Sequence, residues 1–145
     1  MRRRDNRAST TGRWGARNAR AVKALLEEYG EKVETAAKVQ LAEEATRFVA
    51  RAKQLCPVGK PPEDKNPGRL RESIHAEASK DGLVYNVIAD AKTVSKGYPE
   101  GYHYGRVVEY GHNGQPFLYP TMDELRDSIR DNLANAIREA VRDGR

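Results

Sequence analysis

A long helical pattern from Ala19 to Leu55 constrains the fold of this chain more than any other feature. Its apolar side chains recur every three or four residues, at Val22, Leu25 or Leu26, Tyr29, Val33, Ala37, Leu41, Ala45, Phe48, Ala52 and Leu55. This spacing places them on one face of a helix whose opposite face is charged. Gly30 interrupts the pattern and costs about 1 kcal/mol relative to alanine, so we expect a kink or a break there. Pro57 ends the helix because a residue before proline avoids the helical region.

A second helix is predicted after Pro120. We expect Thr121 to cap its first turn, with Glu124 three residues later completing a capping box. Its apolar stripe consists of Leu125, Ile129, Leu133, Ile137 and either Ala140 or Val141. Gly144 follows the predicted last turn.

Two extended segments fall between the helices, at residues 69–79 and 83–89, where apolar side chains alternate with polar ones. The sequence Lys80-Asp81-Gly82 between them indicates a hairpin turn. Residues 57–68, with four prolines and two glycines, and residues 90–101 are predicted to form two long flexible loops. The fold class is therefore α+β, with a long N-terminal helix and a C-terminal helix packed on a small, mainly antiparallel sheet.

Residues 102–120 concentrate aromatic residues, glycines and prolines around one acid, Glu109. The period of two from Tyr104 to Gly111 predicts an extended, exposed aromatic ribbon, which Pro116 and Pro120 would continue. Rigid tyrosines provide contact area at a low entropic cost, so this ribbon indicates a protein-binding surface. The alternative is that Val108, Phe117 and Leu118 form the core of a small sheet, which leaves Tyr110 and Tyr119 at the surface.

The positive charge of the chain is concentrated at its N-terminus. Residues 1–20 hold seven arginines and one acid, whereas residues 21–145 hold 19 basic and 20 acidic residues. We expect residues 1–18 to form a mobile basic arm ahead of a single domain at 19–145. The arm would contact DNA or an acidic partner through Arg2, Arg3, Arg4, Arg7, Arg13, Trp14 and Arg17. The alternatives are a solubilising tail and a segment that docks on a neighbouring subunit through Trp14.

Few residues are suited to catalysis or to metal binding. Cys56 is the single cysteine, and no apolar run is long enough for a membrane helix or a signal peptide. His75, His103 and His112 are scattered, with no nucleophile placed beside them. We expect neither enzymatic activity nor a cofactor. The enzymatic alternative is a nuclease that would lose its activity on replacement of His103 or His112 by alanine.

Short motifs in a fixed order resemble the HK97 gp10-like family of tailed-phage neck proteins, also called tail-completion or head–tail joining proteins. They lie at residues 56–58, 68–74, 108–112 and 116–120. The family pattern is Ala-Pro-Val, Thr-Gly-x-Leu-Arg-x-Ser-Ile, Val-Glu-Phe-Gly-Thr and Pro-Phe-Leu-x-Pro. Pro67 and His112 depart from it, because the family has threonine at both places. The resemblance covers residues 20–143 and leaves the basic arm outside.

The resemblance implies a virion protein that is made in the host bacterial cytoplasm and forms a homo-oligomeric ring in the neck. Its partners would be a head-side connector or stopper protein and a tail terminator or tail tube protein. No contact with a membrane is expected. Contact of the arm with packaged DNA is left open. Partner contacts are expected at Arg69, Leu70, Arg71, Glu109, Tyr110, His112, Phe117 and Tyr119.

Two hypotheses remain open at this point. The first is the neck protein, for which replacing Glu109 with lysine should block incorporation into particles while the monomer stays folded. The second is a small nucleic-acid-binding protein that uses the arginine-rich arm, with Trp14 and tyrosines stacking on bases. A dedicated binder would also carry basic charge on its body, and here the body is close to neutral.

Overall fold

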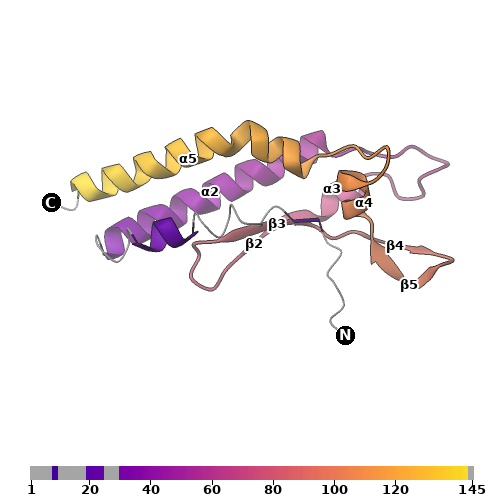
Figure 1. The fold of residues 1–145 in the computed structure, drawn as a ribbon, viewed down its shortest axis with the longest axis horizontal. Helices are drawn as coiled ribbons and strands as arrows, with labels where there is room; N and C mark the ends of the chain where they lie inside the picture. The colour runs from indigo at the N-terminus through magenta and orange to yellow at the C-terminus, as the bar shows by residue number, and fades with distance from the viewer. Residues whose placement is uncertain (1–7, 10–18, 25–29, 144–145) are drawn as a thin grey trace.

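The computed structural model describes residues 8–9, 19–24 and 30–143. Two long helices lie side by side over a small sheet, and a second hairpin projects at one end of the molecule (Figure 1). The long helices are α2 (Glu31–Leu55) and α5 (Leu118–Asp143), and residues 19–24 are also helical. The predicted α+β class, with a long N-terminal and a C-terminal helix beside antiparallel strands, is confirmed.

The main sheet has three antiparallel strands in the order β1 (Ala8–Ser9), β3 (Tyr85–Ala89) and β2 (Ile74–Ala78). Strand β1 pairs Ala8 with Ala89, so two residues of the predicted mobile arm belong to the sheet. The remaining residues of the arm lie outside the described part of the chain.

The break expected near Gly30 is present. Gly30 has a φ of 78°, which glycine adopts readily, and α2 begins at the next residue. Residues 19–24 therefore form a separate helical segment. Lys23 of this segment forms an ion pair with Asp81 at 2.6 Å, in the turn between β2 and β3.

The predicted hairpin turn at 80–82 is confirmed. The Asp81 carboxylate accepts hydrogen bonds from the Ser79 hydroxyl (2.6 Å) and the Leu83 backbone N–H (3.1 Å). The Lys23 ammonium, together with these two bonds, holds the pKa of Asp81 well below its usual range. The Ser79 backbone N–H donates to the Val84 carbonyl at 2.8 Å and closes the hairpin.

Two predicted segments have a different structure. Residues 69–73 form the short helix α3 (Arg69–Ser73) instead of a strand, because Leu70 and Ile74 lie four residues apart and fit a helical turn equally well. The predicted loop at 90–101 is instead largely a hairpin of β4 (Lys92–Ser95) and β5 (Tyr98–His103). Ser95 pairs with Tyr98, so Lys96 and Gly97 make a two-residue turn.

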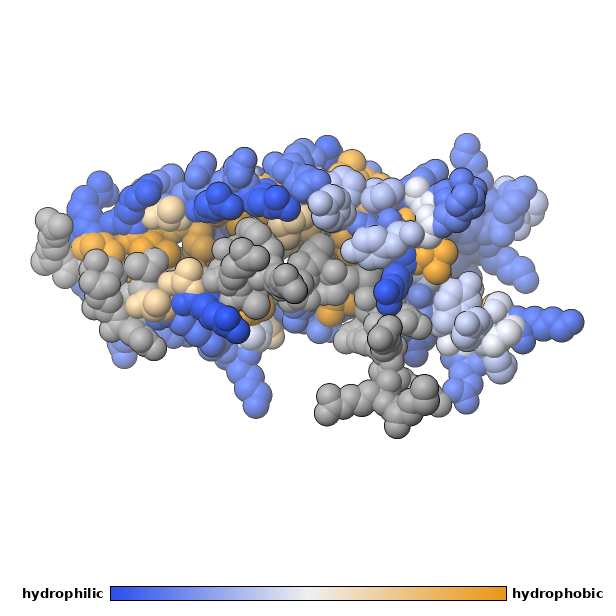
Figure 2. All heavy atoms as spheres, in the orientation of Figure 1, coloured by the Kyte–Doolittle hydropathy of each residue, from blue (hydrophilic) through white to orange (hydrophobic). Residues whose placement is uncertain are grey.

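The core lies between the long helices and the inner face of the main sheet. Phe48 and Ala52 of α2 pack with Ile74, Val87 and Phe117. Ala37, Ala45 and Ala52 of α2 are buried, and their small side chains let neighbouring elements approach the helix closely. Figure 2 shows apolar side chains in a band along the long helices, with hydrophilic side chains on the outer surface.

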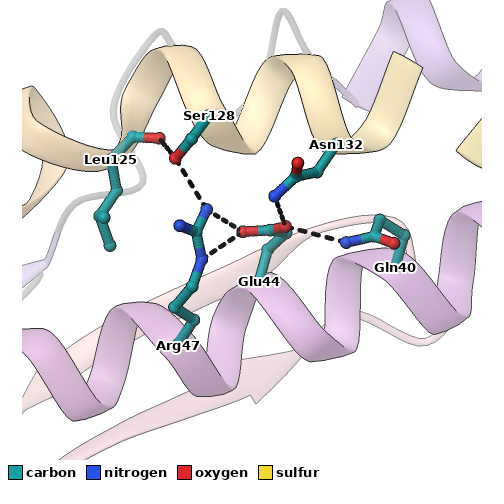
Figure 3. Close-up of polar contacts among 6 residues, drawn as sticks. All are labelled: Gln40, Glu44, Arg47, Leu125, Ser128 and Asn132. Atoms are coloured by element: carbon teal, nitrogen blue, oxygen red, sulfur yellow. Dashed lines mark hydrogen bonds and ion pairs between the residues drawn. The ribbon is translucent and has the colours of Figure 1, made fainter. Parts of the chain in front are cut away.

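Helices α2 and α5 are also joined by a buried carboxylate (Figure 3). Glu44 is only 5% exposed, and it accepts hydrogen bonds from Gln40 (2.8 Å) and Asn132 (2.7 Å). Arg47 donates to the same carboxylate and to the Ser128 hydroxyl at 2.9 Å. Every partner has a fixed position on its helix, so this network sets the register of α5 against α2. Glu44 was not singled out by the helical spacing, which identifies the apolar stripe and not a buried acid beside it.

The Cys56 thiol should be unreactive in the folded protein. Burial raises the pKa of Cys56 from 9.0 to about 11, so little thiolate exists at pH 8. We expect iodoacetamide at pH 8 to label the native chain at least tenfold more slowly than the urea-unfolded chain, measured by intact-mass spectrometry. Equal labelling rates would show that Cys56 is accessible.

Candidate partner-contact surface

The segment predicted as an aromatic ribbon forms a short helix, α4 (Gly105–Tyr110). Gly105 and Glu109 lie four residues apart and are both buried, whereas Arg106, Val107 and Tyr110 are exposed. A β-carbon at Gly105 would lie 2.8 Å from the Ala89 carbonyl oxygen, so only glycine lets α4 approach β3 this closely. The prediction of an extended segment was therefore wrong, because packing against β3 selects the helical spacing.

Glu109 caps the start of α5 from outside that helix. Its Oε2 atom accepts hydrogen bonds from the backbone N–H groups of Phe117 (2.8 Å) and Leu118 (2.9 Å), and its Oε1 atom accepts from Tyr119 (2.6 Å). The first N–H groups of a helix have no partner within it, and a negative charge is favourable there. Pro120 has no N–H to satisfy. One carboxylate thus pairs the free donors from Phe117 to Tyr119.

The predicted capping box at Thr121 and Glu124 is wrong. Helix α5 begins at Leu118, so Thr121 lies inside it and its hydroxyl donates to the Phe117 carbonyl at 2.6 Å. Glu124 is on the surface, where it pairs with Arg51 of α2 at 2.9 Å. The cap comes from Glu109 instead, which sequence spacing within α5 could not indicate.

Three of the expected contact residues belong to the protein's own core. Leu70, Glu109 and Phe117 have exposed fractions of 5%, 3% and 0%. They support the surface from below and do not form part of it. A lysine at position 109 would place a cation against three N–H donors, so we now expect Glu109→Lys to destabilise the monomer itself.

The exposed residues among the expected contacts are Arg69, Arg71, Tyr110, His112 and Tyr119. Tyr110 and Tyr119 have exposed fractions of 63% and 57%, as the sequence analysis expected for these two tyrosines. They flank the Glu109 cap on α4 and α5. Because Glu109 joins these helices, both tyrosines are held on a rigid frame.

Tyr110 also lines a shallow pocket of about 650 Å³ between α4 and β5. We name its larger side chains the tyrosine patch: Tyr98, Tyr102, Arg106, Val107 and Tyr110. The rings of Tyr98 and Tyr102 have centroids 5.1 Å apart and are tilted by 52°. Partial burial raises the pKa of Tyr110, and Glu109 adds to this effect while Arg106 opposes it. Tyr98 and Tyr102 were not predicted as contacts, because residues 90–101 were expected to form a loop and no spacing pattern links Tyr102 to the later tyrosines.

The three histidines are not assembled into a catalytic pair. His103 Nδ1 lies 2.8 Å from the Asp90 carbonyl oxygen, and His75 Nδ1 lies 3.9 Å from the Asp90 carboxylate. The Ser73 carbonyl at 2.8 Å raises the pKa of His75, and Glu77 and Asp90 add to this effect. His112 is on the exposed turn after α4. Within the described residues, no group of three or more His, Cys, Asp or Glu could hold a metal ion.

The arm residues predicted to contact DNA or an acidic partner all lie outside the described residues: Arg2, Arg3, Arg4, Arg7, Arg13, Trp14 and Arg17. Among the helices of the described segments, none has the length and apolar character needed to span a membrane.

Comparison with protein families gives one match over most of this domain. The family described as "Bacteriophage HK97-gp10, putative tail-component" matches residues 20–111, from the first helical segment to the end of α4. The match includes Glu109 and the tyrosine patch, and it stops before α5. It confirms the resemblance inferred from the sequence motifs. No curated protein and no solved structure matches the chain.

Removing the Glu109 carboxylate should destabilise the protein strongly. Glu109→Ala leaves three N–H donors unpaired, two of them buried, so we expect it to lower the free energy of unfolding by about 3 kcal/mol or more. Glu109→Gln retains one acceptor oxygen and should fall between this variant and the wild type. Urea denaturation followed by circular dichroism measures both effects.

The matched control is Glu124→Ala, which removes the carboxylate that the sequence predicted to complete the capping box with Thr121. Its ion pair with Arg51 is exposed, so the expected loss is below about 1 kcal/mol. A loss at Glu124 equal to that at Glu109 would contradict the assignment of the cap.

Proposed function

This chain belongs to the HK97-gp10-like family of bacteriophage tail components, and we propose that copies of it form a ring in the neck of a tailed particle. The ring would join a head-side connector or stopper protein to a tail terminator or tail tube protein. The particle would be an infectious phage or a phage-derived relative. In this proposal the chain is a structural virion protein and acts by binding its neighbours.

The observation that carries the proposal is the exposed tyrosine patch beside a rigid helix junction. Tyr98, Val107 and Tyr110 are each more than half exposed, although the domain has its own buried core. Tyrosine is enriched at protein interfaces because it combines a large apolar ring with a polar tip. A surface of this kind suits a repeated contact between subunits, and a heterologous contact that closes on itself produces a ring.

The exposed residues expected from the family motifs lie on neighbouring elements. Arg69 and Arg71 belong to α3, and His112 follows α4. We propose that these side chains, with Tyr110 and Tyr119, contact the adjoining proteins. The buried residues Leu70, Glu109 and Phe117 would act indirectly, by holding this surface in shape.

Purified tailed particles provide the direct test. Quantitative mass spectrometry should find the chain in a constant ratio to the portal subunit that fits a single ring. Tyr98→Ser/Tyr110→Ser should reduce its copy number per particle about tenfold or more, because interface tyrosines contribute strongly to binding. Both side chains are mostly exposed, so the thermal midpoint should change little.

The control is Val39→Ser on α2, an apolar side chain that is 55% exposed and lies outside the patch. This variant should enter particles at the wild-type level. Absence of the wild-type chain from intact particles would overturn the neck proposal. Normal incorporation of the double tyrosine variant would exclude the patch as the binding surface.

The concentrated charge of the arm favours a second role, binding to DNA. Deleting residues 2–20 would also remove β1, which pairs with β3, so substitution is the cleaner test. In a variant with Arg2, Arg3, Arg4 and Arg7 replaced by glutamine, we expect DNA affinity to become less dependent on salt. The plot of log K against log salt concentration has a negative slope, and the magnitude of this slope should decrease by about 0.9 for each phosphate that the arm no longer neutralises. An unchanged slope would exclude the arm as the DNA-binding segment.

A further inference from the structure

The loop between α2 and α3, at residues 57–68, has a defined shape that it maintains by its own hydrogen bonds. The Asp64 backbone N–H donates to the Lys60 carbonyl at 3.0 Å, and the Asn66 N–H donates to the Asp64 carboxylate at 2.9 Å. The turn formed in this way presents Pro61, Pro62 and Glu63, which are all exposed. We name residues 57–68 the proline loop. Because it is already shaped, binding would cost little additional ordering.

The tyrosine patch has the complementary chemistry. Aromatic rings pack well against the flat face of proline rings, and a proline turn that is already shaped has little entropy to lose on binding. The residues that line the pocket include Arg106 and His103 but no carboxylate. Neither Arg106 nor Glu63 forms an ion pair with any other residue in the described segments. The patch is therefore suited to prolines followed by an acid, which is the sequence Pro61-Pro62-Glu63.

We infer that the proline loop of one copy docks on the tyrosine patch of the next copy, with Glu63 facing Arg106. This inference rests on the proposed ring and identifies the contact that would close it. No residue of the proline loop lines the pocket in its own chain, so the patch is open to a neighbour's loop.

The arrangement in Figure 1 is consistent with such a contact. The proline loop and the β4–β5 hairpin extend from the same end of the molecule, beyond the ends of the long helices that run along it. Copies placed side by side around an axis parallel to these helices would have both surfaces at one level. The loop of each copy can then reach the patch of the next, and the same contact repeats around the ring.

Charge reversal tests the pairing. Glu63→Arg and Arg106→Glu should each reduce the copy number of the chain per particle about tenfold or more, because each places like charges opposite one another. The double variant Glu63→Arg/Arg106→Glu restores opposite charges and should recover incorporation to within about threefold of the wild type. Glu139→Arg, at an exposed site on α5, is the control and should incorporate normally.

The outcomes separate this inference from the proposed function. If the wild-type chain is present in particles and both single variants are incorporated normally, the docking is overturned and the neck role is unaffected. Loss in both single variants without recovery in the double variant would also overturn it, because the two side chains then do not face each other. Wild-type chain absent from particles would overturn the neck role itself.

A photocrosslink tests the same contact without relying on charge. Benzoylphenylalanine at position 110, in particles assembled from a mixture of ¹⁵N-labelled and unlabelled chains, should crosslink to peptides from residues 57–68. Mixed heavy-light pairs would show that the two peptides come from different copies. Crosslinks from position 110 to other peptides only would contradict the docking. Position 39 on α2 is the control and should give no crosslink to the proline loop.

Discussion

The binding of three backbone N–H groups by the Glu109 carboxylate is the interaction on which the candidate surface depends. It joins α4 to the first turn of α5 at a point that is almost completely buried. A buried carboxylate is stable only when its oxygens are hydrogen bonded, so the position of α5 relative to α4 is narrowly defined. Phe117 and Leu118 enter the core as a direct consequence.

A second buried carboxylate has a comparable role further along α5. Glu44 receives hydrogen bonds from its own helix and from Asn132, and Arg47 connects it to Ser128. Apolar packing alone tolerates small shifts between two long helices, whereas hydrogen bonds with fixed partners do not. The two networks together locate α5 at both its first turn and its middle.

Because α4 and α5 are held rigidly, the exposed tyrosines on them are well suited to binding a partner. Tyrosines on a fixed frame lose little entropy on binding, and the proline loop is shaped in advance by the bonds to Lys60 and Asp64. The family assignment places this domain among phage tail components. For this domain we propose assembly into a neck ring, in which the proline loop of one copy docks on the tyrosine patch of the next.

The sequence by itself determined the two amphipathic helices, the break at Gly30, the hairpin at 80–82 and the family, because these follow from local spacing, glycine conformation and short motifs. It also placed Tyr110 and Tyr119 on the surface. Only the tertiary structure decided that residues 105–110 are helical, that Glu109 caps α5 in place of the predicted box of Thr121 and Glu124, and that Tyr98 and Tyr102 line one pocket with Tyr110. These features depend on contacts between segments distant in the chain, which a local pattern does not encode: packing against Ala89 selects the helix, and the free N–H groups of one helix select a carboxylate from another.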